Sequence, residues 1–289
     1  MIFSEPSTEE ADQRFAAALG PDVVLASDDA LTKLDHGIQI TRVNPIDPFL
    51  DAGAVPGVAS VDPDGDVYLR RMPTHGDGFA AEILDEKGDL EKCTSGGVDF
   101  VYAPPPSEVY PPGYQTWVEV EALQQGLCGA KRPGHFRGVA TVVTKLLALF
   151  RPEVALFGEK DFQQLKVIER LNRDLELGVD VVGMPIVRES DGLAMSSRNA
   201  YLSPDERQRA LALVRGLRAA AHLRQNGEHQ VEKLKLAARA ELANAEVRED
   251  YVEVVHPDTL APLTHLEGPA RMLIAAFLGK TRLIDNAPL

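Results

Sequence analysis

Positive charge is scarce in this sequence. Its 289 residues contain 44 Asp and Glu but only 30 Lys and Arg, for a formal net charge of −14. Proteins that bind duplex nucleic acid normally present a basic face, so the composition argues against a nucleic-acid partner. An anionic small molecule would have to meet cations gathered locally, and the candidates are Lys131, Arg132, Arg137, Lys160 and Arg198.

Cysteines and long apolar runs are scarce as well. The two cysteines, Cys93 and Cys128, lack the spacing of a metal site, so we expect reduced thiols, with a single disulfide as the alternative. No stretch approaches the roughly 18 consecutive apolar residues of a membrane span, and the acidic N-terminus lacks the apolar core of a signal peptide. The sequence therefore predicts a soluble, cytoplasmic protein without a membrane partner.

The strongest pattern lies in residues 157–202. An apolar run at 154–157 predicts a strand, and the run ends in Gly158-Glu159-Lys160-Asp161. A helix is predicted next by the spacing of Leu165, Ile168, Leu171 and Leu175. Open α/β sheets bind ligands at such turns, where glycine allows close approach and the helix N-terminus favours an anion. We interpret this turn as an anion site to which Lys160 adds a full charge.

A loop of small and hydroxyl residues follows a second predicted strand at 179–182. Its sequence, DGLAMSSRN at 191–199, places Ser196 and Ser197 beside Arg198. Arginine makes bidentate contacts with phosphate, and serine hydroxyls add neutral hydrogen bonds. The alternative is a solvated loop ahead of a helix cap at Ser203. The turn at 158–161, at a fixed distance upstream, favours phosphate binding.

The remaining pattern indicates two domains. Residues 36–43 predict a strand, and 58–61 with 67–70 predict a hairpin. Aspartates within 62–66 lack the glycine position and the glutamate of an EF-hand loop, so we expect no metal site there. From Ser203 a helix is predicted to about residue 225 and another over 230–245, followed by strands at 251–255, 271–277 and 282–284. The domain boundary is therefore expected near residue 186.

Four long motifs together resemble one family. YPPGYQTWVEVEALQQGLCGAKRPGHFRGVATVV, GEKDFQQL, PIVRESDGLAMSSRNAYLSPDER and TRLIDN are similar to the pantothenate synthetase, or pantoate–β-alanine ligase, family over roughly residues 98–286. The resemblance implies an α/β fold, with a Rossmann-like nucleotidyltransferase domain built on a parallel sheet in 1–186. A smaller C-terminal α+β domain in 187–289 would cover the site.

The resemblance also implies a reaction. Pantoate is adenylated by ATP, with Mg²⁺ on the phosphates, and the pantoyl adenylate then reacts with β-alanine to give pantothenate and AMP. The implied partners are these small molecules and a second copy of the chain in a homodimer.

Site residues are implied by the same motifs. Phosphate contacts and catalysis fall to Lys160, Ser196, Ser197 and Arg198. Adenine and ribose contacts fall to Gly158, Asp161, Val187 and Met195, which complete the ATP-binding set. Pantoate is assigned to Gln164 and to an apolar wall of Val139, Val142 and Val143, which are also expected to be core. His135 is either catalytic or a structural histidine at a helix start.

The first third departs from the family. The family's first nucleotide motif, His-x-Gly-His, occurs nowhere among the seven histidines. The nearest echoes are Pro73-Thr74-His75-Gly76 and the segment 44–49, in reversed order. Either His75 substitutes as a catalytic donor, or half the nucleotide site is missing, or residues 1–97 are a damaged or frame-shifted reading. The alternatives to an active ligase are an impaired relative acting as a nucleotide-binding or dimer partner, and a nucleotidyltransferase for another carboxylic acid.

Overall fold

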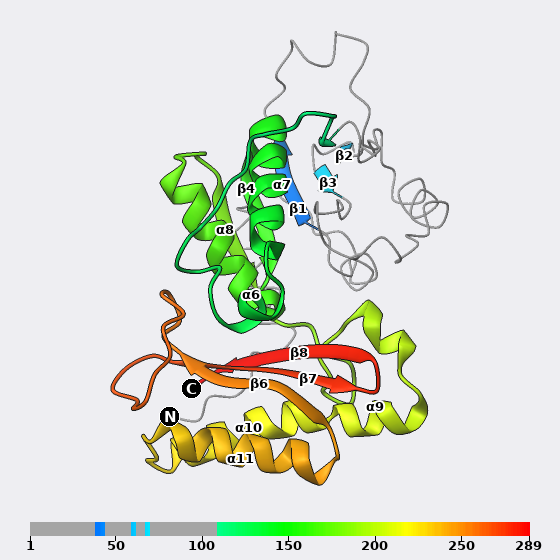
Figure 1. The fold of residues 1–289 in the computed structure, drawn as a ribbon, viewed down its shortest axis with the longest axis vertical. Coiled ribbons are helices and arrows are strands. Elements are labelled where there is room, and N and C mark those ends of the chain that lie inside the picture. Colours follow the sequence, from blue (N-terminus) through cyan, green and yellow to red (C-terminus); the bar gives the residue numbers. More distant parts are fainter. Residues whose placement is uncertain (1–37, 44–58, 62–66, 70–108) are drawn as a thin grey trace. The chain divides into compact units, whose positions relative to one another are not determined.

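The computed structural model describes residues 38–43, 59–61, 67–69 and 109–289 (Figure 1). His75, Cys93 and the segment 44–49 lie outside the described residues. The chain divides into two compact units. The first comprises Met1–Gln124, Arg132–Gly158 and Val167–Met184, and the second comprises Gln125–Lys131, Glu159–Lys166 and Pro185–Leu289. The predicted domains 1–186 and 187–289 stay a prediction, which limited proteolysis would test by cleavage near residue 186.

A mixed sheet forms the frame of the first unit. Its strand order is β2-β3-β1-β4-β5, with β1 at Ile38–Val43, β2 at Ala59–Val61, β3 at Val67–Leu69, β4 at Pro152–Gly158 and β5 at Asp180–Met184. The predicted parallel pairing is confirmed for β4 and β5, where Val154 pairs with Asp180. The predicted hairpin is also present, because β2 and β3 pair antiparallel. Strand β1 joins this hairpin to β4 and is antiparallel to both.

The strand, turn and helix predicted around residue 158 are confirmed. β4 ends at Gly158, a single 3-10 turn η1 spans Glu159–Asp161, and α8 spans Phe162–Asp174. The Asn172 side chain donates to the Val179 carbonyl at 2.7 Å and so fixes the return from α8 into β5. Helix α7, at His135–Phe150, precedes β4 and buries Val139, Val142 and Val143, as expected of core residues, together with Leu146 and Leu147.

The second unit is an antiparallel sheet covered by helices. Strands β6 at Arg248–Val255, β7 at Arg271–Leu278 and β8 at Thr281–Pro288 lie in that order. Helices α10, at Ala212–Gln225, and α11, at Val231–Asn244, run along one face of this sheet (Figure 1). The two helices approach closely at Gly216, where an added Cβ would lie 3.1 Å from the Ala238 carbonyl oxygen. Side chains from both helices and all three strands form one buried core.

Several predicted elements of this unit differ in extent, most of all the helix from Ser203 and the last strand. The helix expected from Ser203 to about residue 225 is interrupted at Leu211, so that α9 covers only Pro204–Ala210. Its start is as predicted, since Ser203 and Glu206 form a reciprocal capping box. Strand β8 runs to Pro288, past the predicted end at 284, because Asp285 and Asn286 are buried with polar partners and need not turn to solvent. Gly279 (φ +56°) enables the two-residue turn before β8.

Within the described segments, no helix has the length and apolar character needed to cross a membrane. Cys128 is a free thiol, as expected. Short helix α6, at Leu127–Lys131, carries it within the second unit.

Candidate nucleotide site

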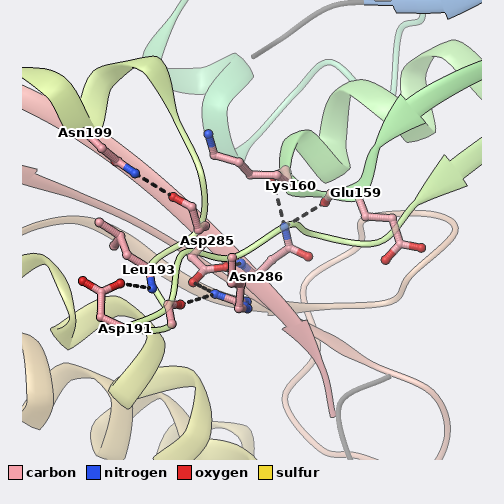
Figure 2. Close-up of polar contacts among 10 residues, drawn as sticks. Glu159, Lys160, Asp191, Leu193, Asn199, Asp285 and Asn286 are labelled. Carbon is pink, nitrogen blue, oxygen red and sulfur yellow. Dashed lines mark hydrogen bonds and ion pairs between the residues drawn. The ribbon is translucent and has the colours of Figure 1, made fainter. Parts of the chain in front are cut away.

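The Lys160 turn is fixed from two sides within the second unit. Arg271 on β7 donates to the Glu159 carboxylate at 2.8 Å and lies over the Phe162 ring, 3.9 Å from its centroid. Burial lowers the pKa of Arg271, and the Glu159 charge offsets part of this effect. Asn286 on β8 donates from its side-chain amide to the carbonyls of Glu159, at 2.9 Å, and Lys160, at 3.0 Å. The backbone of the turn is thereby held while the Lys160 side chain extends away from Asn286 (Figure 2).

Two neighbouring glutamines begin α8 and differ in environment. Gln163 is 3% exposed. Its side chain accepts from the Cys128 backbone N–H at 3.0 Å and donates to the carbonyls of Gln125 and Gly126, both at 3.3 Å. Gln164 is half-buried. Gln163 therefore ties α6 to the start of α8, and the pantoate contact of Gln164 stays a prediction.

The loop after β5 folds back on itself. The Met195 N–H donates to the Val187 carbonyl at 2.9 Å, and the Glu189 N–H donates to the Leu193 carbonyl at 2.9 Å. These bonds place Val187 and Met195, both predicted ATP contacts, side by side. Val187 is 51% exposed. An exposed valine beside a folded backbone offers an apolar surface of the kind an adenine ring can cover.

The serine–arginine motif forms the 3-10 helix η2 at Ser197–Tyr201. The Ser196 hydroxyl oxygen caps this helix by accepting from the Arg198 N–H at 3.3 Å. Because this oxygen accepts, its own O–H remains to be donated to a ligand. Ser197 is exposed and Arg198 is half-buried. Ser196 therefore has a structural role that the sequence did not indicate, in addition to its predicted phosphate contact.

Charged side chains brace this loop. Arg207 on α9 donates to Glu189 at 2.6 Å and to Asp191 at 2.7 Å. Hydrogen bonds from Arg207 lower the pKa of both carboxyls below their usual values. Asn199 donates to Glu189 at 2.6 Å and to the Ala194 carbonyl at 3.1 Å, which joins the two ends of the loop.

Strand β8 links the turn and the loop. Asp285 accepts a bidentate contact from Arg188, at 2.8 and 3.0 Å, and Arg188 also donates to the Gly192 carbonyl at 3.1 Å. Asn286, next along the strand, holds the Lys160 turn. Figure 2 shows both residues between the turn and the loop that carries Asp191 and Leu193. The sequence-predicted site residues that belong to this unit are Lys160, Asp161, Gln164, Val187, Met195, Ser196, Ser197 and Arg198.

The remaining predicted residues belong to the first unit or lie outside the described chain. Gly158 ends β4, and a Cβ added there would meet no other atom within 4 Å. Val139, Val142 and Val143 are buried on α7, as expected of core residues. His135 is the first residue of α7, and its Nε2 atom lies 3.0 Å from Arg132 Nη1, which fits the structural alternative. His75 has no described position.

Several supporting residues were not predicted from the sequence. Asp285 and Asn286 appear in the TRLIDN motif, yet nothing in it signals which segments they bind. Arg207, Glu189 and Asp191 have the charges typical of a solvated surface. Two predicted cations are engaged by carboxylates: Lys131 lies 3.5 Å from Asp250, and Arg137 lies 3.7 Å from Glu119 and over the Trp117 ring.

Comparison with known proteins decides the family. The family model described as pantoate-β-alanine ligase matches residues 79–288. The chain belongs to the pantoate-β-alanine ligase family. The matched region begins at residue 79, whereas the motifs in the sequence indicate the resemblance only from about residue 98. His75 lies outside the matched region.

Individual relatives agree. A pantothenate synthetase of Myxococcus xanthus is 65% identical over 208 residues, which is 71% of each chain. The crystal structure of pantothenate synthetase from Thermus thermophilus superposes with a TM-score of 0.69 at 45% identity, covering 74% of this chain and 78% of that one. The pantoate-beta-alanine ligase of Francisella tularensis, solved with beta-gamma ATP and beta-alanine, has a TM-score of 0.54 at 29% identity and covers 70% and 69% of the two chains. The α/β fold of the ligase family is thus shown for this chain.

Proposed function

We propose that this chain joins pantoate to β-alanine at the expense of ATP. In the first step a pantoate carboxylate oxygen attacks the α-phosphorus of ATP, and the bond to pyrophosphate breaks. In the second step the β-alanine amine attacks the carbonyl of the pantoyl adenylate, AMP leaves, and the amine loses a proton to form the amide of pantothenate. Family membership and the relatives' shared activity carry the overall reaction.

One observation supports the assignment of the site. Asp285 and Asn286 on one strand hold the Lys160 turn and the loop that ends in Ser196-Ser197-Arg198. Adenylation by this route needs no covalent nucleophile, so the protein contributes position and charge. A lysine, an arginine and hydroxyl donors on two fixed segments meet that need.

We assign the ligand contacts accordingly. Lys160, Ser196, Ser197 and Arg198 bind the phosphates, and Gly158, Asp161, Val187 and Met195 bind the adenosine. Gln164 bonds to pantoate, whose apolar side faces Val139, Val142 and Val143. The charge that builds on the α-phosphoryl oxygens is met mainly by Lys160.

Mg²⁺ belongs to this proposal as an ion carried by ATP. Mg²⁺ keeps several waters and is usually bound through substrate phosphates with one or two carboxylates, not in an all-protein cage. In the described part of the chain, no three His, Cys, Asp or Glu side chains are grouped to hold a metal. Glu159 is engaged by Arg271 at 2.8 Å, so this carboxylate is not assigned to the ion.

Pantoate-dependent exchange between ATP and labelled pyrophosphate tests this function, because it follows the first step alone. Exchange that requires pantoate is expected. A panel of other hydroxy acids in the same assay decides whether another acid is the substrate: a second acid that drives faster exchange would replace pantoate in the proposal.

A second candidate rests on the missing His-x-Gly-His. If imidazole donors normally balance charge in the adenylation transition state, their loss reduces catalysis more than ATP affinity. We expect measurable ATP binding with adenylation slower than in a relative that has the motif. His75→Ala tests the proposed substitute: a further loss of exchange at unchanged ATP affinity supports it, and unchanged exchange removes His75 from the site. ATP binding without any exchange would make the chain a non-catalytic nucleotide-binding relative.

A cytoplasmic location and a homodimer are also part of the proposal. Sedimentation of the purified chain tests the dimer, and fractionation of cells tests the location.

A further inference from the structure

The side-chain amide nitrogen of Asn286 donates to two carbonyls of one turn. The residue is 2% exposed, and its Nδ2 atom donates to the Glu159 and Lys160 carbonyls at 2.9 and 3.0 Å. Within the described chain its Oδ1 atom is buried without a hydrogen-bond partner. A buried acceptor without a hydrogen bond raises the free energy of the folded state. The position of the side chain therefore satisfies its amide donors and leaves its oxygen unsatisfied. Its amide donors are therefore committed to the Lys160 turn.

Asp285 binds the other segment. Its side chain is 1% exposed, and both oxygens accept from Arg188, which precedes the loop that ends in Arg198. The Asp285 Oδ1 atom also accepts from the Asn286 backbone N–H at 2.8 Å. The two residues therefore form one polar pair on β8, in which Asn286 binds the Lys160 turn and Asp285 binds Arg188 ahead of the loop.

Strand β8 holds this polar pair in a fixed position. Asp285 pairs with Ile274 and Asn286 pairs with Leu273, both on the buried strand β7. Arg271, on the same strand, holds the Glu159 side chain. A slip of β8 against β7 would move the contact of Asp285 with Arg188 and the contacts of Asn286 with the turn together. The register of β7 and β8 therefore sets the spacing between the turn and the loop.

We infer that Asn286 is a positioning residue for adenylation, which acts through the Lys160 turn and sets it relative to the loop held by Asp285. This inference rests on the proposed function of the site. Misplacing a reacting group by about 1 Å can cost roughly 100-fold in rate. Since Asn286 fixes carbonyls and not the ammonium group itself, the expected loss in Asn286→Ala is about 10-fold to 100-fold in kcat, with a smaller change in the KM for ATP.

A cycle of variants separates positioning from general destabilisation. Pantoate-dependent exchange is measured for wild type, Asn286→Ala, Lys160→Ala and the double variant. If Asn286 acts through Lys160, the double variant is as slow as Lys160→Ala alone, within about 2-fold. Multiplied losses in the double variant would overturn the inference. Leu242→Ala, which opens a cavity in the core of the same unit, is the control for lost stability and should keep its kcat.

Isosteric replacement adds a sharper variant. Asn286→Asp keeps the shape but turns an oxygen toward two carbonyls, so it should be at least as slow as Asn286→Ala. Asn286→Asp with wild-type kcat would overturn the inference, since the amide donor would then be dispensable.

Hydrogen exchange keeps the test independent of turnover. In Asn286→Ala, the backbone amides of 159–166 should exchange faster, whereas those of α11 stay protected; in Leu242→Ala the order reverses. Unchanged protection of 159–166 overturns the inference even if the protein is inactive. Absence of exchange between ATP and pyrophosphate in wild type, together with faster amide exchange in Asn286→Ala, would overturn the proposed function and leave the turn's attachment standing.

Discussion

The Lys160 turn and the loop at 187–199 are held by different forces. The turn's backbone is fixed mainly by neutral hydrogen bonds from Asn286, with one ion pair between Glu159 and Arg271. The loop depends on charge: Asp285 binds Arg188, and Arg207 binds Glu189 and Asp191. Neutral bonds are little affected by salt and pH, whereas the partly exposed ion pairs of Arg207 with Glu189 and Asp191 are screened and titrate. The turn is therefore expected to keep its geometry under conditions that loosen the loop.

The largest effect should come from the chemistry of the turn. Lys160→Ala removes the cation but keeps the carbonyls that Asn286 holds, so adenylation should fall about 10²–10³-fold while the fold persists. Single-turnover formation of AMP measures the rate, and circular dichroism monitors the fold. Lys280→Ala, which removes the same charge from the exposed turn before β8, is the control. An equal loss in both variants would point to net charge in place of a specific contact.

The two glutamines of α8 should separate binding from support. Gln164→Ala leaves a pantoate hydroxyl without its partner, so the KM for pantoate should rise by the equivalent of roughly 1–3 kcal/mol while the KM for ATP changes little. Gln163→Ala breaks the buried contacts with α6 and should lower the free energy of unfolding by a similar amount. Steady-state kinetics and urea unfolding of both variants give the result. A reversed pattern would exchange the two assignments.

A smaller effect is expected when the loop loses its ionic brace. Arg207→Gln removes charged hydrogen bonds to Glu189 and Asp191 and leaves two carboxylates to repel each other near the phosphate loop. The KM for ATP should rise about 10-fold, or ~1.4 kcal/mol. Because salt screens such contacts, added NaCl should narrow the gap from wild type. Arg215→Gln, which breaks a pair with Glu241 outside the loop, should leave the KM unchanged at every salt concentration.

The smallest effect concerns acid. Arg207 lowers the pKa of Glu189 and Asp191 from their usual 4.5 and 3.8. A carboxyl with a lowered folded pKa stabilises the fold above its usual pKa, and this stability is lost as the pH falls through the folded value. The difference in unfolding free energy between wild type and Arg207→Gln should be about 1 kcal/mol near pH 7. It should shrink as the pH falls below about 4. Urea unfolding at both pH values measures it, and a difference that grows in acid would contradict the sign.

Much of the local structure could be predicted from the sequence. The apolar run before Gly158 and the spaced leucines after it define β4, the turn and α8, and Ser203-Pro204 marks the start of α9. These signals are local, because they depend on side chains a few residues apart. The interruption at Leu211 is not visible in the same pattern, since the apolar periodicity continues through it.

The support of the candidate site could not be predicted, because it depends on contacts distant in sequence. Asn286 and Lys160 are separated by 126 positions and meet only through the register of β7 and β8. From the sequence, an aspartate at 285 indicates the end of a strand. The contact with Arg188 that allows Asp285 to be buried within β8 is visible only in the structure. Ser196 was assigned to phosphate from its type and neighbours, and its capping of η2 emerges only from the backbone. The contacts of Lys160, Ser197 and Arg198 with ATP stay predictions.

Pantoate-dependent exchange between ATP and labelled pyrophosphate in the unmodified chain tests the central claim most directly. The account predicts exchange that requires both Mg²⁺ and pantoate, proceeds without β-alanine, and falls about 10²–10³-fold in Lys160→Ala. Exchange that is independent of pantoate, or that persists at full rate in Lys160→Ala, would contradict it.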